Sequence, residues 1–577
     1  MPRWPDCVPT LTDGVVTLRA HSDEDVPLIV ELGRDPASQR ALPLPDPYTE
    51  ADAREFIDSV RDTWESGAAH EWAITGSDGR YAGSANLHHR TAQRAEIGYA
   101  AHPAARGQGL MSRAIRLLVQ RAFDEGVELV RWRSRAGNLA SARVAWSCGF
   151  GAPTVVVGGR VGTDGDVDDE WHAAIRAGDP LHPTRPWWTP AVLDGERIRL
   201  RPWRADDRPT DGPDPIAELG NPGMQPTPET FAEWLAAREL RMAQGEGVFW
   251  CIADRDSDRP LGHVQLARLA PTAHPGTGLL GYWLVPQARG RGYLAEALAL
   301  LIPHAFRARG EDLTGRSGLG LHRLEALADL ANVASQRVLR RAGFREIGLR
   351  REATAATPGS PARDEPIFEL LASDDVAAQA ISPFVTPVFE TPQVRLRPWR
   401  DSDAPQDGDI VDPDAARWVP ERGIPTPETF TAWVARRRRF ADQRQALNWC
   451  LADRATDRAM GNVTLFVHGD EPIDFQAELG YFLWPWARGR RILGEVVPVV
   501  LAHAFAPVEE GGLGLTRVQA GTDSDNLASQ AVLRRAGFRQ WGEDRQAFRA
   551  RDGQLTDGTY FELLATDHAA GQANRTG

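Results

Sequence analysis

Three short segments of the sequence combine glycine and arginine in a pattern that suits an anion-binding loop. Arg106-Gly-Gln-Gly109 recurs as Arg289-Gly-Arg-Gly292 and, in an altered form, as Arg488-Gly-Arg-Arg491. In each copy a predicted strand precedes the segment and a predicted helix follows it. Glycine lets the backbone approach a ligand closely, and the N–H groups and positive dipole end of the following helix can hold a pyrophosphate. A lone Gly-x-Gly would be a weak signal, whereas this placement makes the prediction specific.

A second segment recurs downstream of each loop and indicates that whole domains are repeated. Asn138-Leu-Ala-Ser141 returns as Asn332-Val-Ala-Ser335 and as Asn526-Leu-Ala-Ser529, so that successive copies begin 194 residues apart. The order of the segments is the same in all three copies. Since this period exceeds that of solenoid repeats, each copy is expected to close its own hydrophobic core.

Two stretches with several prolines separate the copies, and proline at this density is typical of a stiff connector. The prolines concerned are Pro180, Pro183, Pro186 and Pro190 in the first stretch, and Pro383 and Pro387 in the second. The predicted organisation is a first domain over 12–176, a linker over 177–193, a second domain over 194–373, a linker over 374–391, a third domain over 392–567 and a tail over 568–577.

The composition is that of a globular protein of several domains. The 577 residues include 66 basic and 79 acidic side chains, a formal net charge of −13 and 42% hydrophobic residues. This length indicates three or four domains, and the acidic balance disfavours nucleic acid as a partner. The first residues lack the apolar segment of a signal peptide, and no apolar run is long enough to span a membrane. We therefore expect a soluble, cytoplasmic protein without a membrane or nucleic-acid partner.

Several conspicuous features are predicted to be structural. The sequence has no lysine, which suggests a bacterial genome rich in G and C. Cys251 and Cys450 follow a tryptophan in matching contexts and are expected to be copies of one buried position. Three tryptophans at one position of the repeat are interpreted as core aromatics: Trp72, Trp250 and Trp449. Two charged runs are interpreted as surface: Arg436–Arg439 and Asp164–Asp169.

Hydrophobic periodicity predicts both strands and helices in the first copy. The expected strands cover residues 15–19, 71–75, 82–88, 95–100, 130–134 and 169–173. The expected helices cover residues 51–64, 110–124 and 138–148, the last closed by a glycine at position 149. A strand, a glycine loop and a helix therefore stand at the centre of each copy.

With these segments the sequence resembles the GCN5-related N-acetyltransferase (GNAT) superfamily, and specifically its branch that acetylates the N-termini of ribosomal proteins. Besides the loop and the Asn-x-Ala-Ser segment with its Gly-Phe end, the resemblance rests on Ala95-Glu-Ile-Gly-Tyr99, Gly281-Tyr-Trp283 and Ala477-Glu-Leu-Gly-Tyr481. It covers nearly the whole chain except the linkers and ends. The family's loop pattern, Gln/Arg-x-x-Gly-x-Gly/Ala, is met in full only by the second copy. The resemblance implies an α/β fold of three tandem domains, each a mixed, mostly antiparallel central sheet flanked by helices.

The resemblance also implies an acetyl-CoA-dependent N-acetyltransferase that uses no metal. Acetyl-CoA would place its pyrophosphate on the loop and its pantetheine along the preceding strand, and an amine would attack the thioester directly. A base must take the proton of the amine, a backbone N–H must stabilise the oxyanion, and a hydroxyl can protonate the thiolate. The acceptor is expected to be a protein N-terminal amine or a small-molecule amine. The implied cofactor-binding residues are Arg106, Gly107, Gln108, Gly109, Leu110, Asn138, Arg289, Gly290, Arg291, Gly292, Tyr293 and Asn332, with Arg488, Gly489, Arg490 and Asn526 as secondary candidates.

The main catalytic candidates come from the first domain. Glu96, on the strand that leads to the loop, is the candidate base, and its alternative role is that of an exposed strand carboxylate. Ser141 is the candidate acid, and its alternative role is to satisfy backbone N–H groups at a helix start. The secondary catalytic candidates in the other domains are Glu478, Ser335 and Ser529.

The three domains are not equally equipped. In the second, Leu279 replaces Glu96, and His263 is either a substitute base or a structural residue. In the third, Arg491 replaces the second loop glycine, and it either obstructs the loop or adds charge to a bound phosphate. The first domain is therefore expected to be the best catalytic candidate.

A rival hypothesis is a non-catalytic acyl-CoA-binding regulatory or scaffold protein whose domains have lost turnover. The incomplete residue sets of the second and third domains favour it, and the first domain disfavours it. His88 and His89 lie near the expected entry of the acceptor, but the sequence shows no metal-ligand partners beside them. Three tandem copies could also pair with one another within one chain.

Overall fold

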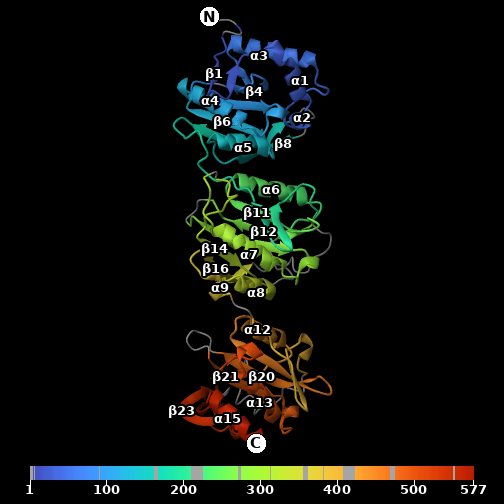
Figure 1. The fold of residues 1–577 in the computed structure, drawn as a ribbon, viewed down its shortest axis with the longest axis vertical. Helices are drawn as coiled ribbons and strands as arrows, with labels where there is room; N and C mark the ends of the chain where they lie inside the picture. The colour runs from blue at the N-terminus through green and yellow to red at the C-terminus, as the bar shows by residue number, and fades with distance from the viewer. Residues whose placement is uncertain are drawn as a thin grey trace. The chain divides into compact units, whose positions relative to one another are not determined.

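The computed structural model describes residues 4, 7–89, 91–161, 167–208, 225–270, 274–311, 313–354, 362–380, 383–406, 423–467, 475–549 and 553–576. Within them the chain forms three sheets of eight strands each (Figure 1). We call each sheet with its helices the first, second or third unit, in chain order. The mixed sheets with flanking helices confirm the predicted α/β fold in three tandem copies.

The first unit contains the elements expected from periodicity and four more. Its strands are β1 (Leu11–Thr12), β2 (Thr17–Arg19), β3 (His70–Thr75), β4 (Tyr81–His88), β5 (Arg94–Ala101), β6 (Leu129–Arg135), β7 (Thr154–Val161) and β8 (Val167–Arg176). Its helices are α1 (Val26–Arg34), α2 (Pro36–Ala41), α3 (Glu50–Ser66), α4 (Leu110–Asp124) and α5 (Leu139–Ser147). The additions are α1, α2, β1 and β7. Strand β7 is exposed along nearly its whole length, so its sequence carries no alternation of apolar and polar residues.

The second and third units repeat this arrangement. The strands of the second are β9 (Leu193–Asp194), β10 (Ile198–Pro202), β11 (Gly247–Asp254), β12 (Pro260–Ala267), β13 (Thr277–Leu284), β14 (Arg323–Leu327), β15 (Arg345–Thr354) and β16 (Arg363–Leu371). Its helices are α6 (Phe231–Ala243), α7 (Tyr293–Phe306), α8 (Val333–Arg341) and α9 (Val376–Gln379). The strands of the third are β17 (Phe389–Glu390), β18 (Val394–Arg397), β19 (Ala446–Asp453), β20 (Ala459–Val467), β21 (Gln476–Leu483), β22 (Arg517–Asp523), β23 (Arg539–Arg549) and β24 (Leu555–Leu564). Its helices are α12 (Phe430–Asp442), α13 (Ile492–Phe505), α14 (Leu527–Arg535) and α15 (Ala565–Thr576).

One pair of neighbouring strands in each sheet is parallel, and its pairing stops early. In the first sheet, whose order is β1-β2-β3-β4-β5-β6-β8-β7, strands β5 and β6 are parallel and α4 supplies the crossover between them. Their pairing ends at Ile97 and Trp132, although β5 continues to Ala101 and β6 to Arg135. We call the unpaired ends, residues 98–101 and 133–135, the fork. The pairs β13–β14 and β21–β22 end in the same way.

The two faces of the first sheet differ in chemistry because successive strand residues point to opposite faces. One face carries buried apolar side chains, among them Trp72, Ile97 and Trp132, which pack with residues of α4 and α5. The opposite face carries polar side chains at the alternate positions of β4 and β5. A smaller apolar cluster from α1 and α3 covers part of this polar face.

A fully buried tryptophan occupies the same strand position in each unit, as the repeat column predicts. The indole N–H of Trp72 donates to the carbonyl of Pro9 at 2.9 Å. Trp250 donates to the carbonyl of Ala191 at 2.9 Å, and Trp449 donates to the carbonyl of Pro387 at 2.8 Å. In all three units the acceptor lies before the first strand, so these upstream residues are tied to the core.

The other features predicted to be structural are also accounted for. Cys251 and Cys450 are buried free cysteines. In the arginine run of α12, Arg438 lies 3.1 Å from Oδ1 of Asp401 and Arg439 lies 2.6 Å from Oε1 of Glu346, whereas Arg437 lies over the ring of Trp433. The first half of the acidic run, residues 164–166, lies outside the described residues, and its second half belongs to strand β8. Among the described helices, none combines the length and the apolarity that a membrane span requires.

The helix after each loop begins in a left-handed backbone conformation. Gly109 (φ 76°) precedes α4 and Gly292 (φ 81°) precedes α7. Arg491 precedes α13 with φ 60°, so the third unit keeps the same turn although it has lost the glycine. Left-handed backbone is strained for a residue that carries a Cβ.

The second and third units fill part of the corresponding sheet face with aromatic side chains. Trp203 donates its indole N–H to Nδ1 of His263 at 3.1 Å, and Trp399 donates to Oδ1 of Asn462 at 2.9 Å. His263 is fully buried, and its Nε2 contacts Oε1 of Gln265 at 3.1 Å. Burial lowers the pKa of His263 to about 3. Burial and the partners of both ring nitrogens favour the core histidine over the substitute base for His263.

We predict that Arg491→Gly stabilises the third unit. The left-handed conformation costs a non-glycine residue about 1 kcal/mol, and glycine removes this cost. Hydrogen exchange of the α13 amides should therefore slow. The reciprocal Gly109→Arg variant should destabilise α4 by a similar amount. Unchanged or faster exchange in Arg491→Gly would mean that the Arg491 side chain makes contacts that offset the strain.

We also predict that acidification destabilises the second unit through His263. The unfolded chain binds a proton at this histidine below about pH 6.5, whereas the folded chain does so only near pH 3. The free energy of unfolding should thus fall as the pH drops below 6.5, by up to about 1.4 kcal/mol per pH unit. His263→Asn installs the residue that the third unit has at this position and keeps an acceptor for Trp203. Thermal unfolding at pH 7, 6 and 5 should depend less on pH in this variant, and an equal dependence would contradict the assignment.

Candidate active site

Helices α4, α7 and α13 begin with backbone N–H groups that are suited to an anion. Within the described ranges, no side chain caps the first turn of any of the three. Three later helices differ, because an asparagine caps each of them: α5, α8 and α14. Free N–H groups and the positive dipole end remain available at the uncapped starts.

The loop glycines leave the space in front of these helix starts open. A Cβ placed on Gly107, Gly109 or Gly290 would meet no atom within 4 Å. The same holds for Gly489 in the third unit, but there Arg491 carries a side chain where the other units have none. The first and second loops therefore fit a pyrophosphate group that is held by backbone N–H groups.

In the second unit a guanidinium group that the loop motif does not include lies beside the loop. Arg197 donates through Nη1 to the carbonyl of Arg291 at 2.8 Å and pairs through Nε with Glu296 at 3.0 Å. A Cβ on Gly292 would come within 3.3 Å of Arg197 Nη2. Arg197 also lies over the ring of Tyr293, 5.2 Å from its centre. Its place in the turn before β10, about ninety residues upstream of the loop, explains why the motif did not reveal it.

The first arginine of each loop forms hydrogen bonds or an ion pair with other residues of the protein. Arg106 Nη2 lies 2.6 Å from Oδ2 of Asp35, and this hydrogen bond is the main cause of a pKa of about 2 at Asp35. Arg289 donates to the carbonyl of Leu284 at 3.1 Å, and Arg488 makes the equivalent contact in the third unit. Since these guanidinium groups have partners within the protein, the backbone is the part of the loop best placed to hold an anion.

Other residues expected at the cofactor also have partners within the protein. Gln108 Nε2 donates to the carbonyl of Ala104 at 2.7 Å, and Arg490 Nη2 lies 2.9 Å from Oδ2 of Asp453. Leu110 is the first residue of α4. The three asparagines cap helices, since Oδ1 accepts a backbone N–H at 3.1 Å in each pair: Asn138–Ser141, Asn332–Ser335 and Asn526–Ser529.

Two hydroxyl groups lie together on the apolar side of the fork. The Tyr99 hydroxyl donates to the carbonyl of Ser141 at 2.8 Å, and the Ser141 hydroxyl accepts the indole N–H of Trp132 at 3.1 Å. In the third unit the Tyr481 hydroxyl lies 2.8 Å from Oγ of Ser529. Burial raises the pKa of Tyr99, so this hydroxyl keeps its proton. Tyr99 was not among the predicted site residues, although the Gly-Tyr pair recurs in every copy.

A row of hydrogen-bonded polar side chains crosses the polar face of the first sheet and ends at the fork. Asn86 Nδ2 donates to Oε2 of Glu71 at 3.3 Å, and Asn86 Oδ1 lies 2.8 Å from Nδ1 of His88. His88 Nε2 lies 3.0 Å from Oε1 of Glu96, and Arg133 Nε donates to the same oxygen. We call these five residues, on strands β3 to β6, the polar row. The strand register brings the members of the polar row together, because Glu71 is opposite Asn86 and His88 is opposite Glu96.

Glu96 is held as a carboxylate of low basicity. Burial would raise its pKa, but the hydrogen bonds from His88 and Arg133 and the charge of Arg133 outweigh this and lower the pKa to about 2. The side chain is 17% exposed and is paired with Arg133, which is 43% exposed. Glu96 is thus neither a free surface carboxylate nor a strong base. It can accept a hydrogen bond and a proton from a strongly acidic donor.

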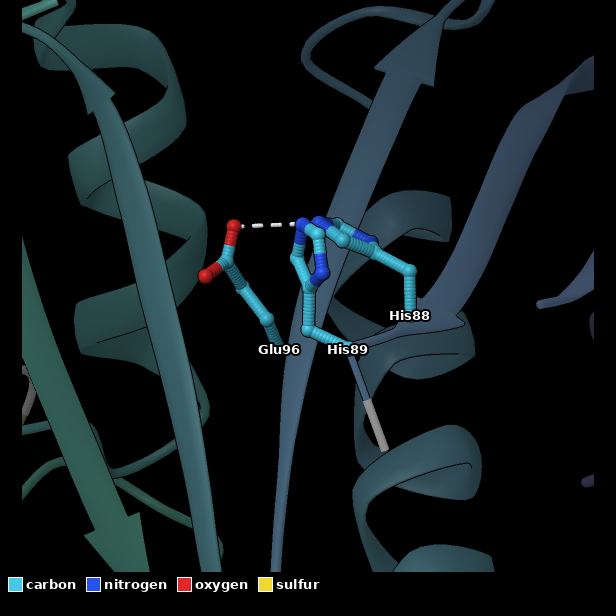
Figure 2. A group of neighbouring side chains, drawn as sticks. All are labelled: His88, His89 and Glu96. Carbon is cyan, nitrogen blue, oxygen red and sulfur yellow. Dashed lines mark hydrogen bonds and ion pairs between the residues drawn. The ribbon is translucent and has the colours of Figure 1, made fainter. Parts of the chain in front are cut away.

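Two histidine rings lie beside this carboxylate. Figure 2 shows the side chains of His88, His89 and Glu96 pointing toward one another. The ring centres of His88 and His89 are 4.8 Å apart. The expectation that no metal-ligand partner accompanies the two histidines is therefore wrong, because the strand pairing brings Glu96 to them.

The polar row is complete only in the first unit, among the residues that the structure describes. The strand registers place Leu279 and Glu478 at the position of Glu96. The positions of Glu71, Asn86, His88 and Arg133 are taken, in that order, by Phe249, Gln265, Ala267 and Leu327 in the second unit. In the third unit they are taken by Asn448, Thr464, Phe466 and Gly521. Glu478 thus faces an aromatic ring where Glu96 faces a histidine.

Comparisons with known proteins agree with this division into three units. The family model described as "Acetyltransferase (GNAT) domain" matches residues 16–151, 197–345 and 393–539. "Probable N-acetyltransferase YjcK" of Bacillus subtilis is 32% identical over 112 residues, which are 19% of this chain and 56% of that protein. "Uncharacterized N-acetyltransferase YoaA" of the same species is 28% identical over 31% of this chain and 97% of that protein. This chain therefore spans little more than half the length of the first relative. The solved ribosomal-protein-S5-alanine acetyltransferase from Vibrio fischeri is 21% identical, with a TM-score of 0.28, and covers 31% of this chain and 98% of its own.

The family match extends over more than half of the chain and recurs in the same order as the three sheets. It coincides in each unit with the strand, glycine loop and helix that the sequence singled out. This confirms both the predicted family and its three-fold repetition. The chain belongs to the acetyltransferase (GNAT) domain family, whose domain it carries three times.

Proposed function

We propose that the chain transfers an acetyl group from acetyl-CoA to a primary amine, and that the first unit performs this reaction. The observation that carries the proposal is the polar row, which holds Glu96 beside the fork. Among the described residues the other units lack this row. Glu96 lies on the strand that leads to an uncapped helix start, so donor and acceptor could meet at one place.

Acetyl-CoA fits the first unit as the acetyl donor. The open face at Gly107 and Gly109, with the N–H groups of α4, suits a pyrophosphate. The backbone of residues 98–101 has no neighbouring strand on the fork side and can pair with the amide groups of a pantetheine arm. An arm bound there would bring the thioester between Glu96 on one face of β5 and Tyr99 on the other.

The reaction requires one bond to form and one to break. The amine nitrogen attacks the thioester carbon, the new C–N bond forms, and the C–S bond then breaks. Glu96 would accept the proton that the nitrogen loses, directly or through a water molecule. Because the pKa of Glu96 is about 2, this transfer is best suited to the stage at which the nitrogen has become strongly acidic through its bond to carbon. The Tyr99 hydroxyl, with Ser141 beside it, would donate a hydrogen bond to the leaving thiolate, which departs without first being protonated.

The acceptor in this proposal is a protein N-terminal amine or a small-molecule amine, attacked directly in a ternary complex. Glu96 gives the polar row a carboxylate beside the fork, to which an amine can donate. The rival function, acyl-CoA binding without turnover, suits the second unit. That unit has an open loop and Arg197, but Leu279 replaces the carboxylate.

Calorimetric titration of the full-length chain with acetyl-CoA tests the binding part of the proposal. We expect two sites, in the first and second units, because Arg491 places a side chain on the third loop. Gly107→Trp and Gly290→Trp fill the two open loops and should each remove one site. A third site would contradict the expected obstruction by Arg491. No binding at all would overturn both the transfer reaction and its acyl-CoA-binding rival.

A matched pair of substitutions tests the catalytic part. Glu96→Gln should lower kcat about 10²- to 10⁴-fold, because the proton acceptor at the fork is lost, and should leave the number of acetyl-CoA sites unchanged. Glu478→Gln changes the same strand position in the third unit and should leave kcat unchanged. The rate is read as CoA release with a panel of primary amines, and also as slow hydrolysis of acetyl-CoA without an acceptor. Equal effects of the two substitutions would refute the assignment to the first unit.

A further inference from the structure

We infer that His88, His89 and Glu96 form a binding site for a divalent transition-metal ion such as Zn²⁺. One ligand atom from each residue lies within 4.8 Å of the others (Figure 2). Imidazole nitrogen and carboxylate oxygen are ligands that Zn²⁺ accepts in tetrahedral sites. Tetrahedral ligand atoms at zinc distances lie about 3.3 Å apart. The largest separation must therefore shrink by up to about 1.5 Å, which a movement of the exposed His89 ring can provide.

The backbone at His89 brings the second ring to the site. Successive residues of a strand point to opposite faces, so His89 would normally face away from His88. His89 instead has a φ of 48°, which lies in the left-handed region that few residues other than glycine adopt, although histidine enters it more readily than most. The two ring centres are therefore 4.8 Å apart at the end of β4. Such a conformation costs free energy and persists where the surrounding structure holds it.

The hydrogen bonds around His88 select the ring nitrogen that faces the site. Asn86 donates through Nδ2 to Glu71 at 3.3 Å, so its Oδ1 is turned to His88 and accepts the N–H at Nδ1. The lone pair of His88 Nε2 then points at Oε1 of Glu96, 3.0 Å away. Two acceptor atoms that face each other need a cation between them, either a proton or a metal ion. A second-shell partner on the far nitrogen is also the usual arrangement for a metal-bound histidine.

The ligand set of the site favours metals that bind imidazole well. Arg133 donates to Oε1 of Glu96, and a metal ion would share this carboxylate with it. Arg133 Nη1 also lies 3.8 Å from Oε2 of Glu170, so the preference among metals rests on the two imidazole ligands rather than on the net charge. Mg²⁺ and Ca²⁺ prefer sets of oxygen ligands, whereas Zn²⁺, Ni²⁺ and Cu²⁺ bind imidazole. The site should therefore take the second group of ions.

Metal binding at this site would also act on the proposed reaction. A metal held by Glu96 occupies the carboxylate that the transfer reaction would use as proton acceptor. Zn²⁺ should consequently inhibit acetyl transfer. This consequence rests on the proposed function, whereas the metal site itself does not.

Binding can be measured without acetyl-CoA. The tag-free full-length chain is titrated with Zn²⁺ in a calorimeter and with Co²⁺ by its visible d–d absorption. We expect one site per chain, at least about tenfold weaker in His89→Ala and in Glu96→Gln. His182→Ala removes another exposed histidine of the first half of the chain and should not change this site. Mg²⁺ should not compete. Zn²⁺ and Co²⁺ binding that is the same in His89→Ala as in the wild type would overturn the inference.

Inhibition provides the second readout and separates the two proposals. Zn²⁺ should inhibit acetyl transfer by the wild type, and His89→Ala should need at least about tenfold more Zn²⁺ for the same inhibition. Binding that depends on His89, but without inhibition, would support the metal site and contradict the role of Glu96 in the reaction. Inhibition that His89→Ala does not relieve would contradict the metal site alone.

Discussion

The early end of the pairing between two parallel strands is the constraint on which the rest of each unit depends. A parallel pair needs a crossover, and α4 supplies it by starting just beyond the carboxyl end of β5. The uncapped start of that helix and the unpaired end of the strand are therefore neighbours in every unit. Whatever binds to the N–H groups of the helix lies beside an open backbone edge. The side chains that flank this edge then decide what chemistry is possible there.

The three units share this frame and differ in what covers the polar face. In the first, Ser84 and Ala100 occupy the paired positions that His263 and Trp283 occupy in the second and Asn462 and Phe482 in the third. Aromatic packing there contributes to the core. In the third unit Asn462, Thr464 and Asn448 are still hydrogen-bonded to one another on this face, but none of them is ionisable. The repeat thus combines one unit with reactive side chains and two in which the same face is used for packing. This division follows from side-chain volume as much as from the loss of a single glutamate.

Local signals in the sequence were sufficient to predict the strand, glycine loop and helix that each unit shares. The loop, the following helix and the asparagine segment could be predicted because turn geometry and hydrophobic periodicity are properties of short stretches. The polar row could not, since its members come from four strands and meet only through register; a shift of one residue would turn His88 away from Glu96. The left-handed conformation of His89 was equally hidden, because the sequence gives no glycine there. Glu96 was identified as a site residue, but its weak basicity depends on Arg133, 37 residues further along the chain.

The buried tryptophan bonds bear on how a chain of this kind can have grown. Each indole N–H finds its acceptor before the first strand, at Pro9, Ala191 or Pro387. A duplicated stretch of gene that began at the first strand would encode a copy with a buried, unpaired indole, at a cost of about 1–3 kcal/mol. The proline-containing residues ahead of each sheet are therefore part of the inherited module, and the natural joints between ancestral copies lie upstream of them.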